Sequence, residues 1–343
     1  MPMPETHADA IVDPVTGFAI SASWIRLCPD PQVLEKIKSG RWVLLSSGLL
    51  CRRGLTTGTT AAAACKGAVL SLCRPVHSLE VATPAGILVS LPVVAKKGYC
   101  LAVKDGGDHQ FDVTAGLEIA AKARPCQETA LVAGKGIGRI AARGLCDEVG
   151  RPALSPSARE QIMRAICEAL QETGLEGAKV QLSVPRGEEL AHKTLNPSLG
   201  ILGGISILGS TGFVEPWNDH FTGDRALELK EAKKVVVTTG RTGLKLSRIL
   251  FPDYKAVLMG SQLDRLAFEK DQKSILCGLP ALILKWAWPQ ILEGTGYGTV
   301  AEMVQSEPQH RNIAAALQMA KKKLPDTRIV LLGKDGSLLA DVP

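Results

Sequence analysis

Apolar and polar residues alternate along the first two thirds of the chain with the two-residue period of half-buried β-strands. The clearest alternation runs over 79–93 and is interrupted by Pro84-Ala85-Gly86, a combination typical of a hairpin turn. Residues 157–173 follow the helical period instead, and Gly174 lies where such a helix would end. These patterns predict an α+β domain of two layers. Its other strands are predicted within 42–50, over 100–104, up to residue 123 and over 178–184.

A second pattern begins near residue 225, where short apolar segments each end in a glycine. These segments are 234–240, 256–260, 274–278 and 328–333, and helices are predicted over 226–232, 244–250 and 309–323. Strands that alternate with helices are typical of a parallel, Rossmann-like sheet. We therefore predict an α/β protein with three parts: a lead-in over 1–40 that packs on the first domain, an α+β domain over 41–228 and a Rossmann-like α/β domain over 229–343.

Composition narrows the classes of function. A chain of 343 residues with 45% hydrophobic and 22% charged residues has enough apolar material for two soluble domains. Aromatic residues make up only 4%, and the longest basic run, 321–323, ends a predicted helix, so we expect no nucleic-acid partner. The net charge of +6 suits a polyanionic small molecule. No apolar run of about 18 residues occurs, so we expect no membrane span.

Cysteine and histidine spacing bears on metal binding and on cellular location. The nine cysteines form no CxxC pair, and the six histidines show no HxH, HxxxH or HExxH spacing. Metal sites built by a protein usually need such spacings, so none is predicted. Reduced cysteines in a long chain that opens without a signal peptide are typical of a cytoplasmic protein.

The stretch from Arg52 to Lys66 combines two arginines, a Thr/Gly turn and an alanine-rich segment. Threonine caps helix starts and alanine favours helix, so a strand, a tight loop and a helix over 60–72 are predicted. The unpaired N–H groups at such a helix start, with the guanidinium groups nearby, would form an anion site. An ordinary capped helix with small residues for close packing explains the same pattern, and both interpretations stay open.

Three other segments carry candidate chemistry. Asp105 and Asp108 flank a Gly-Gly pair and could hold a cation, attract a sulfonium or position a base, or could form an ordinary Asp/Gly turn. Glu188 and His192 could transfer protons or belong to a solvated helical turn. The glycine loop 238–243 follows a predicted parallel strand, where open α/β sheets bind ligands, and a structural turn also explains it. These residues alone indicate an enzyme with an anionic ligand and leave its reaction open.

Several long motifs occur in a fixed order and resemble those of one family. They are Arg52-Arg53-Gly54-Leu55-Thr56-Thr57-Gly58-Thr59-Thr60-Ala61, Lys104-Asp105-Gly106-Gly107-Asp108 with Asp112-Val113-Thr114-Ala115-Gly116, Gly187-Glu188-Glu189, Lys193-Thr194-Leu195-Asn196-Pro197 and Gly203-Gly204-Ile205-Ser206-Ile207-Leu208-Gly209-Ser210-Thr211-Gly212-Phe213-Val214-Glu215-Pro216. From about residue 40 to its C-terminus the chain resembles the cobalt-precorrin-5B C1-methyltransferases of the anaerobic cobalamin pathway, the CbiD family, in its archaeal-type branch. It departs from the family pattern at 108–112, where the acidic turn is one residue longer, and over 278–300, whose role stays open.

The resemblance implies a reaction and its participants. A methyl group from S-adenosyl-L-methionine would be transferred to C-1 of cobalt-precorrin-5B, giving cobalt-precorrin-6A, and cobalt would be present only as part of the substrate. Positioning supplies most of the catalysis in such a displacement. No catalytic residue is therefore assigned beyond the candidates Asp105, Asp108, Glu188 and His192. Besides the cobalt-precorrin macrocycle, a homodimer and transient contacts with neighbouring enzymes of the pathway are partners to test.

From these residues we also predict where the two ligands would bind. Carboxylates of the macrocycle would meet Arg52, Arg53, Lys66, Lys104, Lys193 and the turn formed by Thr56, Thr57, Gly58 and Thr59. The methyl donor would lie at Thr238, Thr239, Gly240 and Gly243, with Gly209, Thr211 and Gly212 facing it across a cleft between the domains. Two other functions stay open: an NAD(P)-linked oxidoreductase that uses the second domain, and a non-catalytic tetrapyrrole-binding protein.

Overall fold

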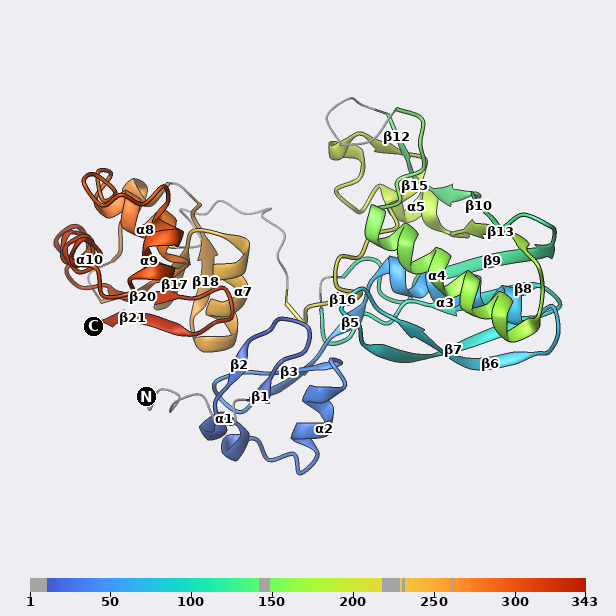
Figure 1. The fold of residues 1–343 in the computed structure, drawn as a ribbon, viewed down its shortest axis with the longest axis horizontal. Coiled ribbons are helices and arrows are strands. Elements are labelled where there is room, and N and C mark those ends of the chain that lie inside the picture. Colours follow the sequence, from blue (N-terminus) through green and yellow to red (C-terminus); the bar gives the residue numbers. More distant parts are fainter. Residues whose placement is uncertain are drawn as a thin grey trace. The chain divides into compact units, whose positions relative to one another are not determined.

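The computed structural model describes residues 11–110, 112–141, 149–217, 229, 232–260, 262–269 and 271–343. Contacts between residues divide the chain into two compact units (Figure 1). The six-stranded unit, named after its main sheet, consists of Glu35–Val43 and Cys51–Asp219. The five-stranded unit consists of Met1–Leu34, Leu44–Leu50 and His220–Pro343. The architecture is mixed α/β, as the sequence predicts.

The main sheet of the six-stranded unit has the order β10-β13-β9-β8-β7-β6. β10 and β13 run parallel, and the other neighbours are antiparallel. β6 and β7 form the hairpin predicted over 79–93, with Leu79 opposite Leu91 and Val81 opposite Val89. The strands are β6 (Val76–Ala82), β7 (Leu88–Lys96), β8 (Tyr99–Val103), β9 (Glu118–Pro125), β10 (Ala130–Ala133) and β13 (Ala178–Ser183).

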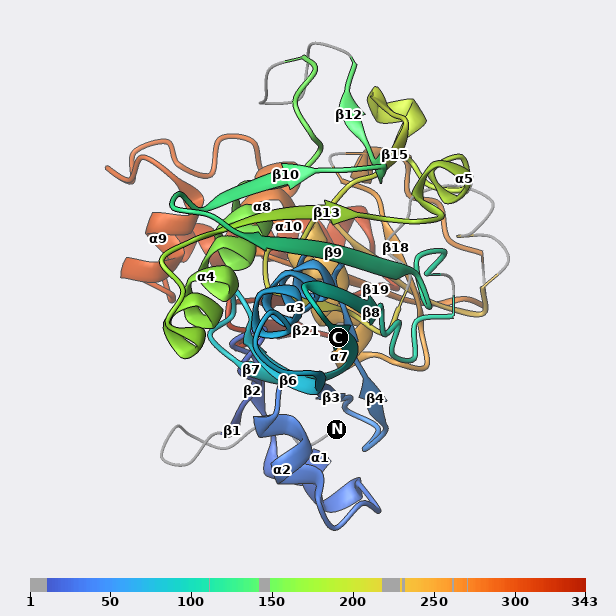
Figure 2. The ribbon, with the colours of Figure 1, turned by 90° about the vertical axis from the view of Figure 1, so that its right-hand side faces the viewer.

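Helix α3 (Thr57–Leu70) is the centre of this unit. It packs against α4 (Pro156–Thr173) and against five strands of the sheet, which curves around it (Figure 2). Every residue of α3 except Lys66 is buried, and its alanines and glycines let the neighbouring elements approach closely. A Cβ at Gly67, for example, would lie 2.5 Å from the Sγ of Cys100. The helix begins three residues before its predicted start, because Thr56 is the residue that caps it.

Helix α4 confirms the most regular helical pattern of the sequence. Ser155 caps it by accepting a hydrogen bond from the Ala158 N–H, and Pro156 occupies its first turn. Gly174 ends it with a φ of 70°, a left-handed conformation that glycine adopts without strain. Local signals therefore set both ends of this helix.

Short elements complete the unit. Buried Asn196 organises the chain after α5, because its Nδ2 donates to the Gly204 carbonyl at 3.1 Å and its Oδ1 accepts from the Ser206 hydroxyl at 3.1 Å. The paired strands are β3 (Trp42–Leu44) with β4 (Leu50–Arg52), β5 (Gly54–Leu55) with β16 (Phe213–Val214), β11 (Gly136–Ile137) with β15 (Gly204–Ile205) and β12 (Arg139–Ile140) with β14 (Ile201–Leu202). The helices are α2 (Val33–Lys38), α5 (Gly187–Ala191) and the 3-10 turn η1 (Pro197–Leu199).

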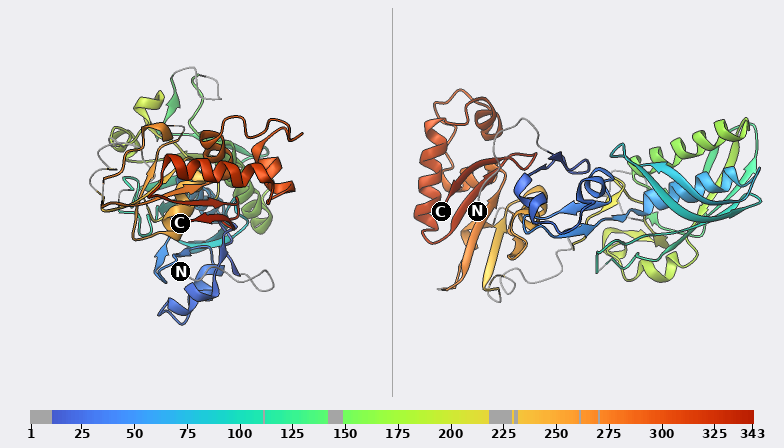
Figure 3. Two further views of the ribbon diagram at one scale, coloured as in Figure 1. Left: turned by 90° about the vertical axis from the view of Figure 1, so that its left-hand side faces the viewer. Right: turned by 90° about the horizontal axis from the view of Figure 1, so that it is seen from below.

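The five-stranded unit contains a sheet of order β18-β17-β19-β20-β21. The first four strands of this order are parallel, and β21 is antiparallel to β20. Figures 1 and 3 show α7 on one face of the sheet and α8, α9 and α10 on the other. The strands are β17 (Lys234–Thr238), β18 (Lys255–Leu258), β19 (Lys273–Gly278), β20 (Arg328–Leu332) and β21 (Leu338–Val342). The helices are α7 (Arg241–Leu250), η2 (Leu263–Arg265), α8 (Pro280–Ala287), α9 (Val300–Ser306) and α10 (Arg311–Lys323).

The helix predicted over 226–232 falls largely outside the described residues. The sequence predicts a lead-in over 1–40 that packs on the first domain. Its described residues 11–34, with β1 (Ile11–Val12), β2 (Ala19–Ile20) and α1 (Ala22–Leu27), group with the five-stranded unit, and only residues 35–40 group with the six-stranded unit. The Phe18 ring stacks on Trp24 with 5.5 Å between centroids, and a Cβ at Gly336, between β20 and β21, would touch it. Burial of this aromatic pair explains the grouping.

Candidate functional site

Three of the sequence motifs meet at strand β5. On one side, β5 pairs with β16. On the other side, the Leu55 N–H donates to the Asp105 carbonyl at 2.7 Å, and Arg53 forms an antiparallel bridge with Gly107. We call this place the β5 junction, and it joins the segments 52–60, 104–116 and 203–216.

Gly107 lies where the acidic segment touches the backbone of β5. Its φ is 62°, and a Cβ there would lie 2.3 Å from the Gly54 nitrogen and 2.5 Å from the Arg52 carbonyl oxygen. Gly116, in the same loop, has a φ of 74°, but a Cβ there would meet nothing within 4 Å. Glycine is needed at position 107 both because two backbone segments approach closely and because the conformation is left-handed. At position 116 glycine is needed for the left-handed conformation alone.

Replacing Gly107 with alanine should therefore destabilise the six-stranded unit more than the same change at Gly116. At Gly116 only the left-handed conformation is unfavourable, which costs about 1–2 kcal/mol. At Gly107 the added methyl group also forces two backbone segments apart, and the total loss should be about 2–5 kcal/mol. Urea denaturation followed by circular dichroism compares the two variants, and equal losses would contradict the close approach.

Arg53 is fully buried and bound to the protein. Its Nε donates to Oε2 of Glu215 at 3.0 Å, and its Nη1 donates to the carbonyls of Gly40 and Trp42, each at 3.2 Å. A guanidinium group held in this way does not reach a carboxylate in solvent. Arg53 is therefore poorly placed for the predicted substrate contact, because it links residues beside β5 and β16 to residues 40–42.

Asp105 is shared by two guanidinium groups. Its Oδ2 accepts hydrogen bonds from Nη1 of Arg52 at 2.6 Å and from Nη2 of Arg41, and its Oδ1 accepts from the Gly107 N–H at 2.9 Å. Burial alone would raise the pKa of Asp105, but these three partners outweigh it and hold the pKa below its usual value. Asp108 accepts a hydrogen bond from the Arg52 N–H at 2.6 Å. Sequence reasoning missed Arg41, which lies outside the first motif.

Lys104 forms a buried ion pair with Asp112. Its Nζ donates to Oδ2 of Asp112, whose Oδ1 accepts from the Thr114 hydroxyl at 2.5 Å and from the Thr114 N–H at 2.9 Å. Burial alone would raise the pKa of Asp112, but the Lys104 ammonium and the Thr114 groups outweigh it and lower the pKa. Since only 2% of the Lys104 side chain is exposed, this predicted substrate contact is held inside the fold.

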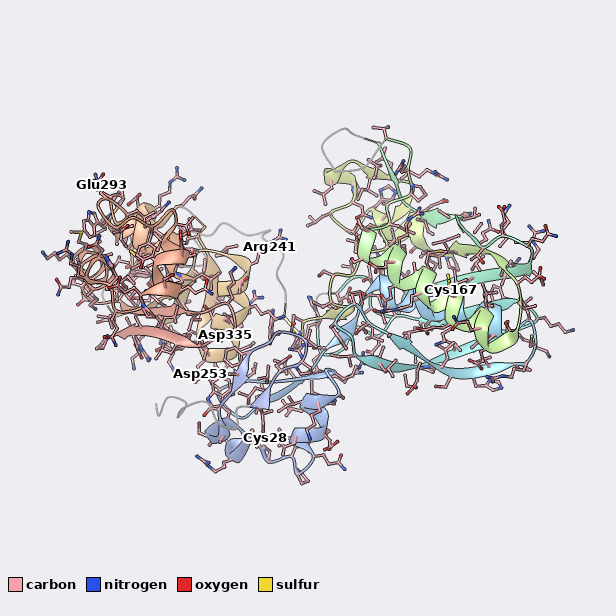
Figure 4. The ribbon with its side chains drawn as sticks, viewed as in Figure 1. Cys28, Cys167, Arg241, Asp253, Glu293 and Asp335 are labelled. Atoms are coloured by element: carbon pink, nitrogen blue, oxygen red, sulfur yellow. The ribbon has the colours of Figure 1, made fainter. Side chains whose placement is uncertain are left out.

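The lowered pKa of Asp112 makes part of the stability depend on pH. Its folded pKa lies below the unfolded value of about 4, so its contribution is fully present above that value and is lost as the pH falls through the folded pKa. Between about pH 7 and about pH 3, wild-type protein should lose more stability than Asp112→Asn, which has no carboxylate to protonate. Thermal denaturation across this range tests the difference, and parallel curves would contradict it. Exposed Asp253, labelled in Figure 4, provides the control Asp253→Asn, which should follow the wild type.

The start of α3 is closed by protein groups. The Gly58 N–H donates to the Leu208 carbonyl at 2.9 Å, and the Thr59 N–H donates to Oγ1 of Thr56 at 3.2 Å. Oγ1 of Thr57 accepts from the Leu208 N–H at 2.9 Å. Protein acceptors thus occupy N–H groups that a bound anion would need. The ordinary capped helix, and not an anion site, accounts for the Thr/Gly turn.

The other predicted anchors differ in exposure. Nζ of Lys66 donates to Oε2 of Glu168 at 2.7 Å and to a carbonyl of β6 at 2.8 Å, so it links α3 to α4 and β6. Lys193 is exposed just after α5, where Glu188 and His192 are exposed too. The structure therefore brings the three predicted residues of this segment together at the surface and ties Lys66 into the fold.

The residues at 209–212 are explained by packing within the six-stranded unit. A Cβ at Gly209 would lie 2.5 Å from Oγ1 of Thr56. Gly212 has a φ of 89°, and a Cβ there would lie 2.6 Å from that of Thr83. Thr211 uses its hydroxyl within the same turn. These contacts account for the residue types without a methyl donor.

The predicted glycine loop follows β17, at a point where the chain leaves two neighbouring strands in opposite directions. β17 leads through α7 to β18 on one side, and β19 leads through α8, α9 and α10 to β20 on the other. Open α/β sheets bind ligands beyond the carboxyl ends of the strands at such a point. Arg241, labelled in Figure 4, begins α7 there and is exposed.

This point of the fold combines buried hydroxyl groups with open space at Gly240. Thr238 ends β17 with a buried hydroxyl that has no hydrogen-bond partner among the described residues. A Cβ at Gly243 would lie 2.2 Å from this oxygen, and one at Gly278 would lie 3.3 Å from it and 3.1 Å from Oγ1 of Thr239. A Cβ at Gly240 would meet nothing within 4 Å, and no side chain caps α7. The loop thus combines hydroxyl groups with an uncapped helix start.

The described part of the chain has neither a cluster of metal ligands nor a membrane-spanning helix. No three His, Cys, Asp or Glu side chains gather there as metal ligands would. None of its helices is both long and apolar enough to cross a lipid bilayer. The acidic groups found at the β5 junction are instead bound to arginine, lysine and backbone N–H groups.

A model of the CbiD family matches residues 46–216, which include the whole β5 junction. The chain is 44% identical to cobalt-precorrin-5B C(1)-methyltransferase of Methanococcoides burtonii, over 97% of this chain and 98% of that protein. The protein of the same name from Methanosarcina acetivorans is 45% identical, over 96% of this chain and 98% of its own. The 1.9 Å crystal structure of the cobalamin biosynthesis protein CbiD from Archaeoglobus fulgidus is similar, with a TM-score of 0.56 and 37% identity over 81% of this chain and 93% of that one. The chain therefore belongs to the CbiD family.

Proposed function

We propose that the protein transfers a methyl group from S-adenosyl-L-methionine to C-1 of cobalt-precorrin-5B and so forms cobalt-precorrin-6A in cobalamin biosynthesis. The observation that carries this proposal is the 44–45% identity, over nearly the full length, to proteins named cobalt-precorrin-5B C(1)-methyltransferase. The β5 junction supports it, because segments far apart in sequence meet there inside the region that the family model matches. Such a displacement needs exact placement of two substrates and no protein nucleophile.

Arg52 is the proposed anchor for a carboxylate of the macrocycle at the β5 junction. Its side chain keeps 36% of its surface exposed, and it shares one oxygen of Asp105 with Arg41. Because Arg41 and Arg52 share one carboxylate, N–H groups of the two guanidinium groups stay available for a second carboxylate. Arginine can bind such a carboxylate bidentately. Exposed Lys193 is proposed as a second anchor. The other predicted cationic anchors are left out, because protein carboxylates already hold them.

Replacing Arg52 with alanine should raise the KM for cobalt-precorrin-5B roughly tenfold or more, because a hydrogen bond to a charged group contributes about 1.5–3 kcal/mol. The affinity for S-adenosyl-L-methionine should stay near that of the wild type. Steady-state kinetics and calorimetry measure the two effects. Arg74→Ala is the matched control, since Arg74 also pairs with a carboxylate, that of Glu172, but lies beyond the opposite end of α3. An unchanged KM in Arg52→Ala would rule out this anchor.

The proposed site for the methyl donor is the carboxyl end of β17 and β19 in the five-stranded unit. The uncapped start of α7 after Gly240 fits the polar groups of the donor's amino acid and ribose, whereas the hydroxyl groups of Thr238 and Thr239 are buried against Gly243 and Gly278 and support this loop from within. The donor, when bound, supplies an electrophilic methyl group. The divergence of the chain after β17 and β19 also supports a Rossmann-like interpretation of this unit.

Proton transfer, if the reaction needs it, has four candidates from the sequence: Asp105, Asp108, Glu188 and His192. Asp105 is held ionised by its arginine partners, so it suits the positioning of Arg52 better than the removal of a proton. Glu188 and His192 are exposed on the α5 segment beside Lys193.

The experiment that tests the function incubates the full chain with cobalt-precorrin-5B and S-adenosyl-L-methionine carrying a labelled methyl group. We expect label at C-1 of the product, with the Methanosarcina acetivorans protein assayed in parallel. An NAD(P)-linked oxidoreductase would instead bind reduced dinucleotide and not S-adenosyl-L-methionine. A non-catalytic tetrapyrrole-binding protein would bind the macrocycle without turnover. Either of these outcomes would overturn the proposed methyl transfer.

A further inference from the structure

The outer face of the six-stranded sheet, opposite α3, carries large apolar side chains. Val94 is 68% exposed, Val103 51% and Tyr99 39%. Antiparallel sheets usually present polar side chains on a face that is exposed to water. Among the described elements, β7, β8 and β9 pack extensively only on neighbouring strands and on α3. Apolar patches of this kind mark interaction surfaces.

The register of the strands arranges the patch in rows that cross the sheet. Val94 of β7 lies opposite Leu101 of β8, which lies opposite Ala120 of β9, and these three form the central row. Tyr99 and Val103 lie two residues before and after Leu101, so they point to the same face in the rows on either side. The central row is therefore apolar over three strands, with Val94 exposed, Leu101 half-buried and Ala120 buried.

The two sides of the central row carry opposite charge. In β9, Glu118 belongs to the row of Val103, and Lys122 belongs to the row of Tyr99, which Lys96 of β7 joins from the other side. Beyond Lys122, Arg124 lies directly opposite Lys179 of β13. Like charges opposite each other across strands are unfavourable, so negative groups from another molecule would stabilise this side.

We propose that this face binds the same face of a second copy of the chain in a two-fold symmetric dimer. The two-fold axis would run along the central row, in the plane between the two sheets. Each strand then lies opposite the same strand of the second copy and runs in the reverse direction. The axis then places Leu101 against Leu101 of the partner subunit. It also places Lys122 against Glu118 of the partner subunit, and this ion pair occurs twice.

Charge complementarity favours a second copy over other occupants of this face. A polyanionic ligand or an anionic membrane would match Lys122, Arg124 and Lys179 but would be repelled by Glu118. A two-fold symmetric dimer pairs Lys122 of one copy with Glu118 of the other. The same contact buries the apolar rows of both copies. This inference is independent of the proposed reaction.

The oligomeric state of the full chain, measured by sedimentation equilibrium, tests the proposal. The wild type should have about twice the chain mass of 36.4 kDa. Leu101→Asp places two carboxylates against each other at the axis and should give a monomer. Leu88→Asp is the matched control: Leu88 is 63% exposed on the same face of β7, but three rows from the axis, so its opposite position falls beyond the end of that strand. This control should remain dimeric.

An exchange of charges distinguishes this dimer from any other. Glu118→Lys and Lys122→Glu each bring like charges together at two places, so each should raise the dissociation constant of the dimer roughly tenfold or more. The double variant restores both ion pairs and should recover the wild-type constant. A monomeric wild type, a dimer that survives Leu101→Asp, or a double variant no tighter than the single ones would overturn the proposal. So would a monomer that binds anionic vesicles or the macrocycle through this face.

Discussion

Replacing Arg53 with methionine should lower the free energy of unfolding of the six-stranded unit by about 3–5 kcal/mol. The guanidinium group is fully buried, and Glu215, with 14% of its side chain exposed, would lose it as a partner. The carbonyls of Gly40 and Trp42 would each lose a hydrogen bond as well. Carboxylates and carbonyls that lose donors in the interior are costly. Methionine fills part of the space, so the loss reflects charge and hydrogen bonding more than a cavity.

Hydrogen exchange of the amides of α3 is the suitable measurement, because it reports the opening of this unit separately from that of the five-stranded unit. Arg52→Met is the control: Arg52 is partly exposed, and its loss should cost less than about 1 kcal/mol. The double variant Arg53→Met with Glu215→Leu removes both charges and should recover much of the stability. Wild-type protection in Arg53→Met would contradict the internal role of Arg53.

The same pair of arginines shows where sequence reasoning stops. Arg52 and Arg53 are adjacent and chemically alike, but successive side chains of an extended segment point to opposite sides. One of them is therefore partly exposed and the other buried, and the choice depends on Glu215 and Gly40, which come from other parts of the fold. Arg41 shares Asp105 with Arg52, yet nothing in the local pattern around Arg41 indicates that contact.

Elements whose local signals agree with their packing were predictable. Ser155, Pro156 and Gly174 mark the ends of α4, and the alternation around 84–86 marks the β6–β7 hairpin. The Thr/Gly turn before α3 was ambiguous because the same residues suit an anion site and a capped helix. The carbonyl that decides between them belongs to Leu208, which only the tertiary structure brings to the helix start.

The proposed donor site is the loop after β17, and Gly240 offers the sharpest test of this proposal. The backbone there is extended, with a φ of −152°, and a Cβ would meet nothing within 4 Å. A large side chain at this position should therefore leave the fold intact and fill the space beyond the carboxyl end of β17. Thr238 is less suitable, because it is fully buried and its replacement by a large residue would disturb the sheet.

Gly240→Trp should weaken the binding of S-adenosyl-L-methionine about a hundredfold or more, a difference of about 2.8 kcal/mol. Titration calorimetry measures the affinity, and thermal denaturation should show an unchanged fold. Gly240→Ala is the matched control and should bind nearly as well as the wild type, because a methyl group occupies little of the open space. Wild-type affinity in folded Gly240→Trp would exclude this loop as the donor site. That result would not bear on methyl transfer or on the Arg52 anchor, because these two proposals are tested by the labelled product and by the KM for the macrocycle.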